Sequence, residues 1–281
     1  MNTRKVVIGM DVEFMAYKSK KQVFPVDDID LRSCGCDEFG HCVEIRPRQA
    51  DNKKELLFNI MSEMDDLPKK FLYKSENKIT MNKKEFFRLL KRMGSKEISQ
   101  CKNIYGADIL DDPPVTTPDS RYAYCGMHIH VSKHIDFMDS ENNWNEIPLN
   151  INAEFLTYMF DEYIFDALKM DTCFYVGKYR QPGFYEPKGN YGHFEYRSLG
   201  VSAFTPKRVS IIFDMVKLIT ENADMLLTHR FVRAENGLHD AFHTSSTEHK
   251  IEVLNELDTL KRKLEKTTEY KGNLKTLWIR W

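Results

Sequence analysis

The chain has 281 residues, and its 41 Lys and Arg nearly balance its 42 Asp and Glu, which gives a net charge of −1. This balance argues against a non-specific nucleic-acid binder and against a polybasic membrane-surface protein, because both need a clear basic excess. The composition is 42% apolar, 30% charged and 12% aromatic, as in a globular protein. No clear boundary divides the sequence, so we expect a single domain over residues 1–281.

The sequence predicts neither a membrane span nor an exported protein. No stretch reaches the roughly 18 uninterrupted apolar residues of a spanning helix. The apolar part of residues 1–9 is too short for the core of a signal peptide. We therefore expect a cytoplasmic protein whose six cysteines are reduced.

The first half of the chain is predicted to contain two strands, two helices and a loop. Polar and apolar residues alternate within 6–14 and again within 41–47, which is typical of strands. Apolar residues recur at steps of three and four over 51–72 and over 82–93, which predicts helices. The proline-rich segment 111–119 is predicted to be a loop.

The second half is predicted to contain two more strands, at residues 126–132 and 192–198. Apolar periodicity predicts three helices, over 151–170, 206–227 and 246–270. A segment rich in glycine, proline and tyrosine is a predicted loop at 181–192. Because the strands alternate instead of being apolar throughout, they favour an antiparallel sheet with one polar face, and hence an α+β fold.

Each predicted strand carries two ionisable residues at positions i and i+2, which share one face of a strand. These pairs are Asp11 and Glu13, Glu44 and Arg46, His128 and His130, and Glu195 and Arg197, with Asp37 seven positions before Glu44. Carboxylates that converge need cations between them, and an oxygen-rich site with an imidazole suits Mg²⁺ or Mn²⁺. The arginines fit an anionic ligand such as a phosphate.

A single pair of this kind is more often a solvated sheet face or a cross-strand ion pair than a site. Four such pairs on four strands favour a functional site. The chain has no P-loop signature and no Gly-x-Ser-x-Gly nucleophile signature. Two alternatives to nucleotide chemistry stay open: a metal-dependent hydrolase that uses the same residues with a water nucleophile, or a non-catalytic binding protein.

Several motifs resemble a known family. The Gly-Met-His-Ile-His segment at 126–130 resembles one in glutamine synthetases, and Glu-Tyr-Arg at 195–197 resembles their later Glu-x-Arg strand. Together with the motifs at 9–13, 37–47 and 179–185, the set resembles the phage-encoded carboxylate–amine ligases (COOH-NH2 ligase type 2), which are relatives of glutamate–cysteine ligase. The resemblance implies a largely antiparallel, curved sheet of the glutamine synthetase-like catalytic type with helices packed on its outer face. It runs from residue 9 to about 200 and leaves a helical C-terminal part, about 206–281, without a recognised motif.

The resemblance also implies a mechanism and a set of site residues. Family members use ATP to phosphorylate a carboxylate, and an amine then attacks the acyl phosphate to give an amide. Carried over by motif, one Mg²⁺ would be held by Asp11, His128 and Glu195, and a second by Glu13, Asp37 and Glu44. His130 would lie near the nucleotide phosphates, and Arg197 and Arg180 would neutralise the γ-phosphate.

The resemblance does not specify the two substrates. The carboxylate and amine could belong to a small molecule, a peptide, a protein side chain or a modified nucleobase, and a homo-oligomer is compatible with the sequence. A phage origin would place the protein in the host cytoplasm. Where the family pattern has an arginine after Gly-x-Tyr, this chain has Glu186, which bears on the substrate more than on the ATP chemistry.

Three cysteines lie close together in the sequence. Cys34, Cys36 and Cys42, with the neighbouring His41, could form a zinc site, although they lack the Cys-x-x-Cys spacing of a zinc knuckle. Alternatively, they are buried thiols that pack as small apolar side chains. Both interpretations remain open at the level of sequence.

Overall fold

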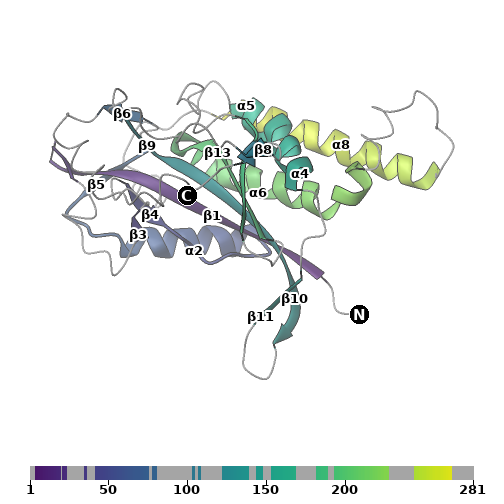
Figure 1. The fold of residues 1–281 in the computed structure, drawn as a ribbon, viewed down its shortest axis with the longest axis horizontal. Coiled ribbons are helices and arrows are strands. Elements are labelled where there is room, and N and C mark those ends of the chain that lie inside the picture. The colour runs from purple at the N-terminus through teal and green to yellow at the C-terminus, as the bar shows by residue number, and fades with distance from the viewer. Residues whose placement is uncertain are drawn as a thin grey trace.

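The computed structural model describes most of the predicted strands and helices. It covers residues 4–19, 21–23, 35–36, 42–75, 78–80, 103–104, 107–108, 122–138, 144–147, 153–168, 182–188, 193–227 and 244–267. These residues form a mixed α+β fold in which an open antiparallel sheet carries helices (Figure 1).

Five strands form the middle of the sheet and lie in the order β4-β1-β10-β13-β12. Their bounds are β1 Arg4–Lys18, β4 Val43–Ile45, β10 Gly126–Met138, β12 Phe184–Lys188 and β13 His193–Gly200. Every neighbouring pair is antiparallel, and β1 and β10 lie side by side over most of their length (Figure 1). The predicted antiparallel sheet is therefore confirmed.

Shorter strands extend this sheet or pair beside it. Those of the main sheet are β2 Lys21–Val23, β3 Gly35–Cys36, β5 Leu72–Lys74, β7 Asn103–Ile104, β8 Ala107–Asp108 and β11 Trp144–Ile147. Two more, β6 Lys78–Thr80 and β9 Tyr122–Tyr124, pair with each other. Among the described residues, the main sheet has 11 strands.

The two faces of β1 differ in chemistry, as its alternating sequence predicts. Met10, Val12 and Phe14 are fully buried in the apolar core, whereas Asp11 and Glu13 project from the opposite face. Apolar residues of the neighbouring strands and of the helices join the same core cluster. The helices therefore cover the apolar face and leave the polar face of the sheet for the site.

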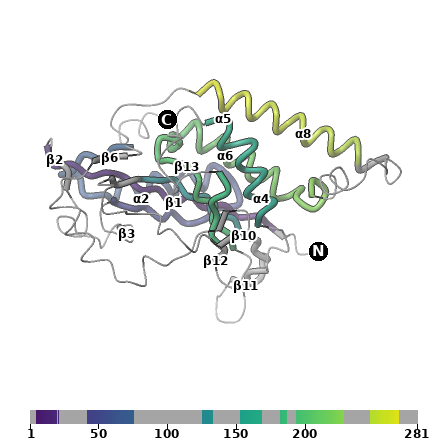
Figure 2. Tube along the Cα trace, turned by 45° about the horizontal axis from the view of Figure 1, so that its top comes forward, coloured from purple at the N-terminus to yellow at the C-terminus, as the bar shows by residue number. Residues whose placement is uncertain are grey.

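The helices pack in layers over this core. Their bounds are α2 Lys53–Asp66, α4 Ala153–Phe160, α5 Asp166–Leu168, α6 Pro206–Glu221 and α8 Thr244–Glu265, with a π-helical turn at Asp161–Phe165 and a 3-10 turn at Val201–Ala203. Asn52 caps α2 and Thr205 caps α6, each by accepting a backbone N–H with its side chain. Helix α8 lies outermost and contacts α5 and α6 (Figure 2). Within the described part of the chain, no helix combines the length and the hydropathy needed to cross a membrane.

A buried arginine ties the end of α8 to the sheet. Arg208 is fully buried, and its Nε donates to the hydroxyl of Thr267 at 2.7 Å. Its Nη1 donates to the carbonyl of Ser202, directly after β13, at 2.8 Å. These hydrogen bonds join the first turn of α6, Thr267 just beyond α8, and the segment that follows the site strand β13.

Two sequence predictions need correction. The helix predicted over 51–72 ends at Asp66, because Leu67 takes an extended conformation before Pro68, and β5 begins at Leu72. The loop predicted at 181–192 contains strand β12, which pairs with β13 on one side and β7 on the other. The predicted helix 82–93 and loop 111–119 lie outside the described residues.

Candidate metal centre

Strand register brings the predicted residue pairs together on one face of the sheet. Asp11 on β1 is opposite His128 on β10, and Glu13 on β1 is opposite Glu44 on β4. On the far side of β10, His130 is opposite Glu195 on β13. Since these four strands are neighbours, residues from distant parts of the chain form one continuous polar row.

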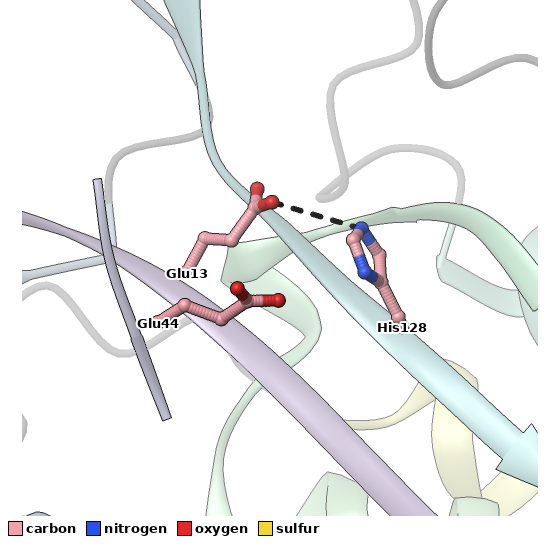
Figure 3. Close-up of side chains that lie close together, drawn as sticks. All are labelled: Glu13, Glu44 and His128. Atoms are coloured by element: carbon pink, nitrogen blue, oxygen red, sulfur yellow. Dashed lines mark ion pairs between the residues drawn. The ribbon is translucent and has the colours of Figure 1, made fainter. Parts of the chain in front are cut away.

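Three side chains in this row could hold a metal ion. Glu13, Glu44 and His128, hereafter the trio, are all buried, and each offers a ligand atom within 4.8 Å of the other two. Their side chains extend toward one another from three strands, with Glu13 Oε1 at 3.9 Å from His128 Nε2 (Figure 3). The backbone N–H of Gly126 donates to the other oxygen of Glu13 at 2.7 Å and so orients the carboxylate. Two carboxylates and one imidazole fit a divalent cation such as Mg²⁺ or Mn²⁺.

The electrostatics of Glu44 favour a bound cation. Burial, followed by the negative charge of Glu13, raises the pKa of Glu44 to about 7, although the adjacent Arg46 opposes this. The guanidinium of Arg46 pairs with the Glu44 carboxylate, but most of the Arg46 side chain is exposed. Two buried carboxylates at this separation resist simultaneous ionisation, and a divalent cation between them removes the repulsion.

Glu195 joins the trio to an arginine. Its Oε1 lies 2.8 Å from Nδ1 of His128 and 3.2 Å from Nη1 of Arg197. Burial by itself would raise the pKa of Glu195, but the charges of His128 and Arg197 outweigh burial and hold this pKa well below its ordinary value. Arg197 also donates to Glu186 on β12 at 2.7 Å. The arginine is thus held between two carboxylates at the side of the trio.

A β-bulge occurs where β13 passes His128. The register between β10 and β13 shifts between Met127 and Ile129, so β13 has one more residue than β10 over this stretch. Bulges of this kind redirect side chains and are common beside active sites. Here the bulge falls in the part of β13 that follows Glu195 and carries Arg197.

Asp11 contacts a different histidine from the one expected. Its Oδ2 lies 3.1 Å from Nε2 of His130, and Nδ1 of His130 lies 2.9 Å from Nε2 of His193. These three side chains come from β1, β10 and β13 and continue the polar row beside the trio. The rings of His130 and His193 meet edge to face. Each ring nitrogen of His130 therefore lies close to a polar side chain, Nδ1 to His193 and Nε2 to Asp11.

The structure gathers most of the predicted site residues. Those brought together are Asp11, Glu13, Glu44, His128, His130, Glu195 and Arg197. Arg180 and Asp37 lie outside the described residues. His128 was expected to share one cation with Glu195, while Glu13 was expected to bind a second cation. In the structure His128 lies close to both glutamates. The role of Glu186 as a partner of Arg197 was missed, because its segment was expected to be a loop.

Cys42 lies two residues before Glu44 in the chain and belongs to the apolar core. Its Sγ is 2.7 Å from Sγ of Cys125 and 3.9 Å from Sδ of Met15, and all three side chains are buried. Cys42 and Cys125 are not joined by a disulfide. Burial agrees with the apolar interpretation for Cys42, while Cys34 and the side chain of Cys36 lie outside the described residues.

Comparison with known proteins adds no relative to this picture. The chain matches no protein-family model, and no curated protein is significantly similar to it.

Proposed function

We propose that the protein is an ATP- and Mg²⁺-dependent carboxylate–amine ligase that forms an amide through an acyl phosphate. The observation that carries this proposal is the convergence of Glu13, Glu44 and His128 with Glu195 and Arg197 on the polar face of one antiparallel sheet. Phosphoryl transfer needs cations and fixed donors more than it needs covalent help from the protein. An acidic trio with an arginine beside it is suited to that requirement.

In this proposal the trio holds one divalent cation, and Asp11 and Asp37 are further ligands that the motif resemblance implies. Glu195, which the resemblance also makes a ligand, here orients His128 through Nδ1. The bound cation would supply charge neutralisation at the phosphates. Arg197 would donate to the γ-phosphate as it is transferred, and Arg180 would assist it. His130, which lies beside Asp11 and His193, would lie near the nucleotide phosphates.

The reaction has two steps. A substrate carboxylate oxygen attacks the γ-phosphorus, the bond to the β-γ bridging oxygen breaks, and ADP leaves. The amine nitrogen then attacks the carbonyl carbon of the acyl phosphate, inorganic phosphate leaves, and the amine loses a proton. The carboxylate and the amine are not specified by the described residues.

We further propose that the sheet is the curved, glutamine synthetase-like type and that the chain is related to the phage-encoded ligases its motifs resemble. Two features support this proposal. The strand order β4-β1-β10-β13 makes neighbours of the four motif-bearing strands. The helices also cover the face opposite to the polar row, as that architecture requires.

A metal-dependent hydrolase is a second candidate. The observation in its favour is that the trio alone supplies two carboxylates and one imidazole, a set that also suits a cation carrying a nucleophilic water. A hydrolase would keep Mn²⁺ or Zn²⁺ through purification and act on an ester or phosphoester without nucleotide.

The deciding experiment measures nucleotide binding and turnover. Calorimetry should show Mg²⁺-dependent binding of a non-hydrolysable ATP analogue. Incubation with ATP, Mg²⁺ and a metabolite extract should release phosphate and give a mass-spectrometric product equal to two metabolites minus water. Glu195→Gln should abolish phosphate release, whereas Glu221→Gln, on α6 and paired with Lys217, should retain it. Absence of binding by the wild-type protein at millimolar Mg²⁺ and nucleotide would overturn the proposal.

A further inference from the structure

The segment that follows β4 returns to β1 next to the metal centre. Ile8 and Ala50 exchange two backbone hydrogen bonds, of 2.9 and 3.0 Å, and form an isolated antiparallel bridge. In an antiparallel register this bridge sets Gln49 beside Gly9. Gly9 is two residues before Asp11 and is opposite His130 on β10, so Gln49 lies at the end of the polar row.

Gly9 leaves the space that the Gln49 side chain occupies. A Cβ atom at Gly9 would lie 2.8 Å from Cγ of Gln49, closer than such atoms approach, and 3.6 Å from its carboxamide carbon. The same point is 3.5 Å from Cβ of His130. The Gln49 side chain therefore lies across β1 in the immediate neighbourhood of His130, and the absence of a side chain at Gly9 makes this close approach possible.

A buried hydroxyl fixes the end of this side chain. Ser132 on β10 is fully buried, and its Oγ donates to Oε1 of Gln49 at 2.8 Å. Since β4 and β10 flank β1 on opposite sides, Gln49 spans β1 from one neighbour to the other. With Oε1 engaged, the carboxamide still has its two N–H donors, and no described residue accepts a hydrogen bond from them.

We propose that Gln49 is a ligand-binding residue whose carboxamide N–H groups donate to an anionic oxygen of the molecule held at the metal centre. The anion is a phosphate or a carboxylate, which is the chemistry common to the substrates in the proposed function, on which this assignment of the ligand rests. Asp11, two residues after Gly9 on β1, is a carboxylate, so an anion can approach this end of the row only where donors or cations face it.

Three separate features hold the Gln49 side chain in place, which supports a binding role. They are the backbone bridge at Ile8 and Ala50, the missing side chain at Gly9 and the buried hydroxyl of Ser132. A glutamine loses up to roughly 2 kcal/mol of side-chain entropy when it is held in one conformation. Fixing Gln49 in the folded protein removes this cost from ligand binding.

The test uses Mg²⁺ alone, Mg²⁺ with inorganic pyrophosphate, and Mg²⁺ with acetate. Isotope-edited NMR follows the side-chain NH2 signals of Gln49, assigned by their disappearance in Gln49→Ala. We expect a downfield shift with pyrophosphate if the anion is a phosphate and with acetate if it is a carboxylate. By calorimetry, Gln49→Ala should weaken binding of that anion about 3- to 10-fold, and Gln49→Glu should weaken it about 10-fold or more.

Two further variants test whether the position of the Gln49 side chain matters and whether the loss of anion binding is specific to this residue. Gly9→Ala places a methyl group against Gln49 and should reproduce the loss seen in Gln49→Ala. Asn255→Asp, the same amide-to-acid change on the exposed face of α8, should leave anion binding unchanged. In Gln49→Ala, Gln49→Glu, Gly9→Ala and Asn255→Asp, the affinity for Mg²⁺ should stay within twofold of the wild-type value. That result would show that the metal centre is still folded.

The outcomes separate this inference from the proposed ligase activity. If the wild type binds Mg²⁺-ATP but Gln49→Glu has wild-type affinity for every anion and the NH2 signals do not move, the inference is wrong and the ligase proposal stands. If an anion shifts the NH2 signals while Mg²⁺-ATP does not bind, the inference stands without the ligase. No shift together with no nucleotide binding overturns both.

Discussion

Nδ1 of His128 and Oε1 of Glu195 lie 2.8 Å apart, with both side chains buried. An ionised carboxylate only accepts hydrogen bonds, so this contact favours a proton on Nδ1. Nε2 of His128, on the side of Glu13, is then the nitrogen that can give up its proton and bind a cation. A carboxylate that fixes the tautomer of a histidine in this way is typical of metal sites, where it orients the ligand.

This relationship predicts different effects for two glutamates. Glu44→Gln removes a member of the trio and should weaken Mn²⁺ binding about 100-fold, whereas Glu195→Gln, acting through His128, should weaken it about 10-fold. Glu186→Gln is the matched control, because Glu186 also pairs with Arg197 but is not in the trio. Calorimetric titration with Mn²⁺ measures all three. An equal loss in Glu44→Gln and Glu195→Gln would show that Glu195 binds the metal directly.

Glu44 should make the metal-free protein less stable as the pH rises. Its pKa is raised to about 7 from 4.5, so its contribution to stability is complete below pH 4.5 and is lost as the pH rises through 7. The loss is roughly 3 kcal/mol in the free energy of unfolding between pH 4.5 and 8. Glu195 has the opposite sign, but its lowered pKa means that its contribution is lost only below pH 4.5.

Denaturant unfolding at pH 5 and pH 8 measures this effect. We expect the pH-dependent loss to shrink in Glu44→Gln and to be reversed in the wild type by millimolar Mg²⁺, since the cation favours the ionised carboxylates. The difference between wild type and Glu44→Gln isolates Glu44 from histidines that titrate in the same range. A wild-type protein that gains as much stability as the variant from pH 5 to 8 would contradict the prediction.

Asp161 in the π-helical turn is expected to stabilise the site strands from behind. One of its oxygens accepts from the hydroxyl of Tyr196 on β13 and the other from the backbone N–H of Gly183 before β12, both at 2.7 Å. Asp161→Ala leaves these two buried donors without an acceptor and should cost about 2–4 kcal/mol of unfolding free energy. Tyr196→Phe removes one of the two bonds and leaves that oxygen of Asp161 without its donor, so it should cost less than Asp161→Ala, which loses both bonds. Thermal or denaturant unfolding measures both variants. Equal losses of unfolding free energy in Asp161→Ala and Tyr196→Phe would contradict this prediction.

The buried thiols should be unreactive and should not contribute to metal binding. Cys42 and Cys125 are buried in the core, so a maleimide should label both slowly in the folded protein and rapidly after unfolding, as mapped on their peptides by mass spectrometry. Cys42→Ser should leave Mn²⁺ affinity unchanged, because Cys42 is not part of the trio. Loss of bound zinc in Cys42→Ser would instead support the zinc interpretation of the cysteine cluster.

Much of the site could be predicted from the sequence because strand periodicity is local. Alternation with a period of two assigns Asp11 and Glu13 to the face opposite Met10 and Val12, and the contacts agree. Met10 and Val12 belong to the apolar core, whereas Asp11 and Glu13 lie close to His130 and His128. The alternation of β13 places Glu195 in the same way. For this reason the seven residues that the structure brings together could be assigned to one face of the sheet. Alternation could not predict the end of α2 at Asp66 or strand β12, since helix ends depend on single residues such as Pro68 and strands depend on their partners.

The sequence by itself therefore determined the charge balance, the polar pairs and the face of each strand from which they project. Tertiary structure decided that His128 lies between Glu13 and Glu195, that Glu186 holds Arg197 and that Gln49 crosses Gly9 to reach Ser132. The physical reason is that backbone hydrogen bonds between strands are nearly independent of side-chain identity. Which residues become opposite partners is set by the packing of the whole core, and a one-residue bulge beside His128 is enough to change it.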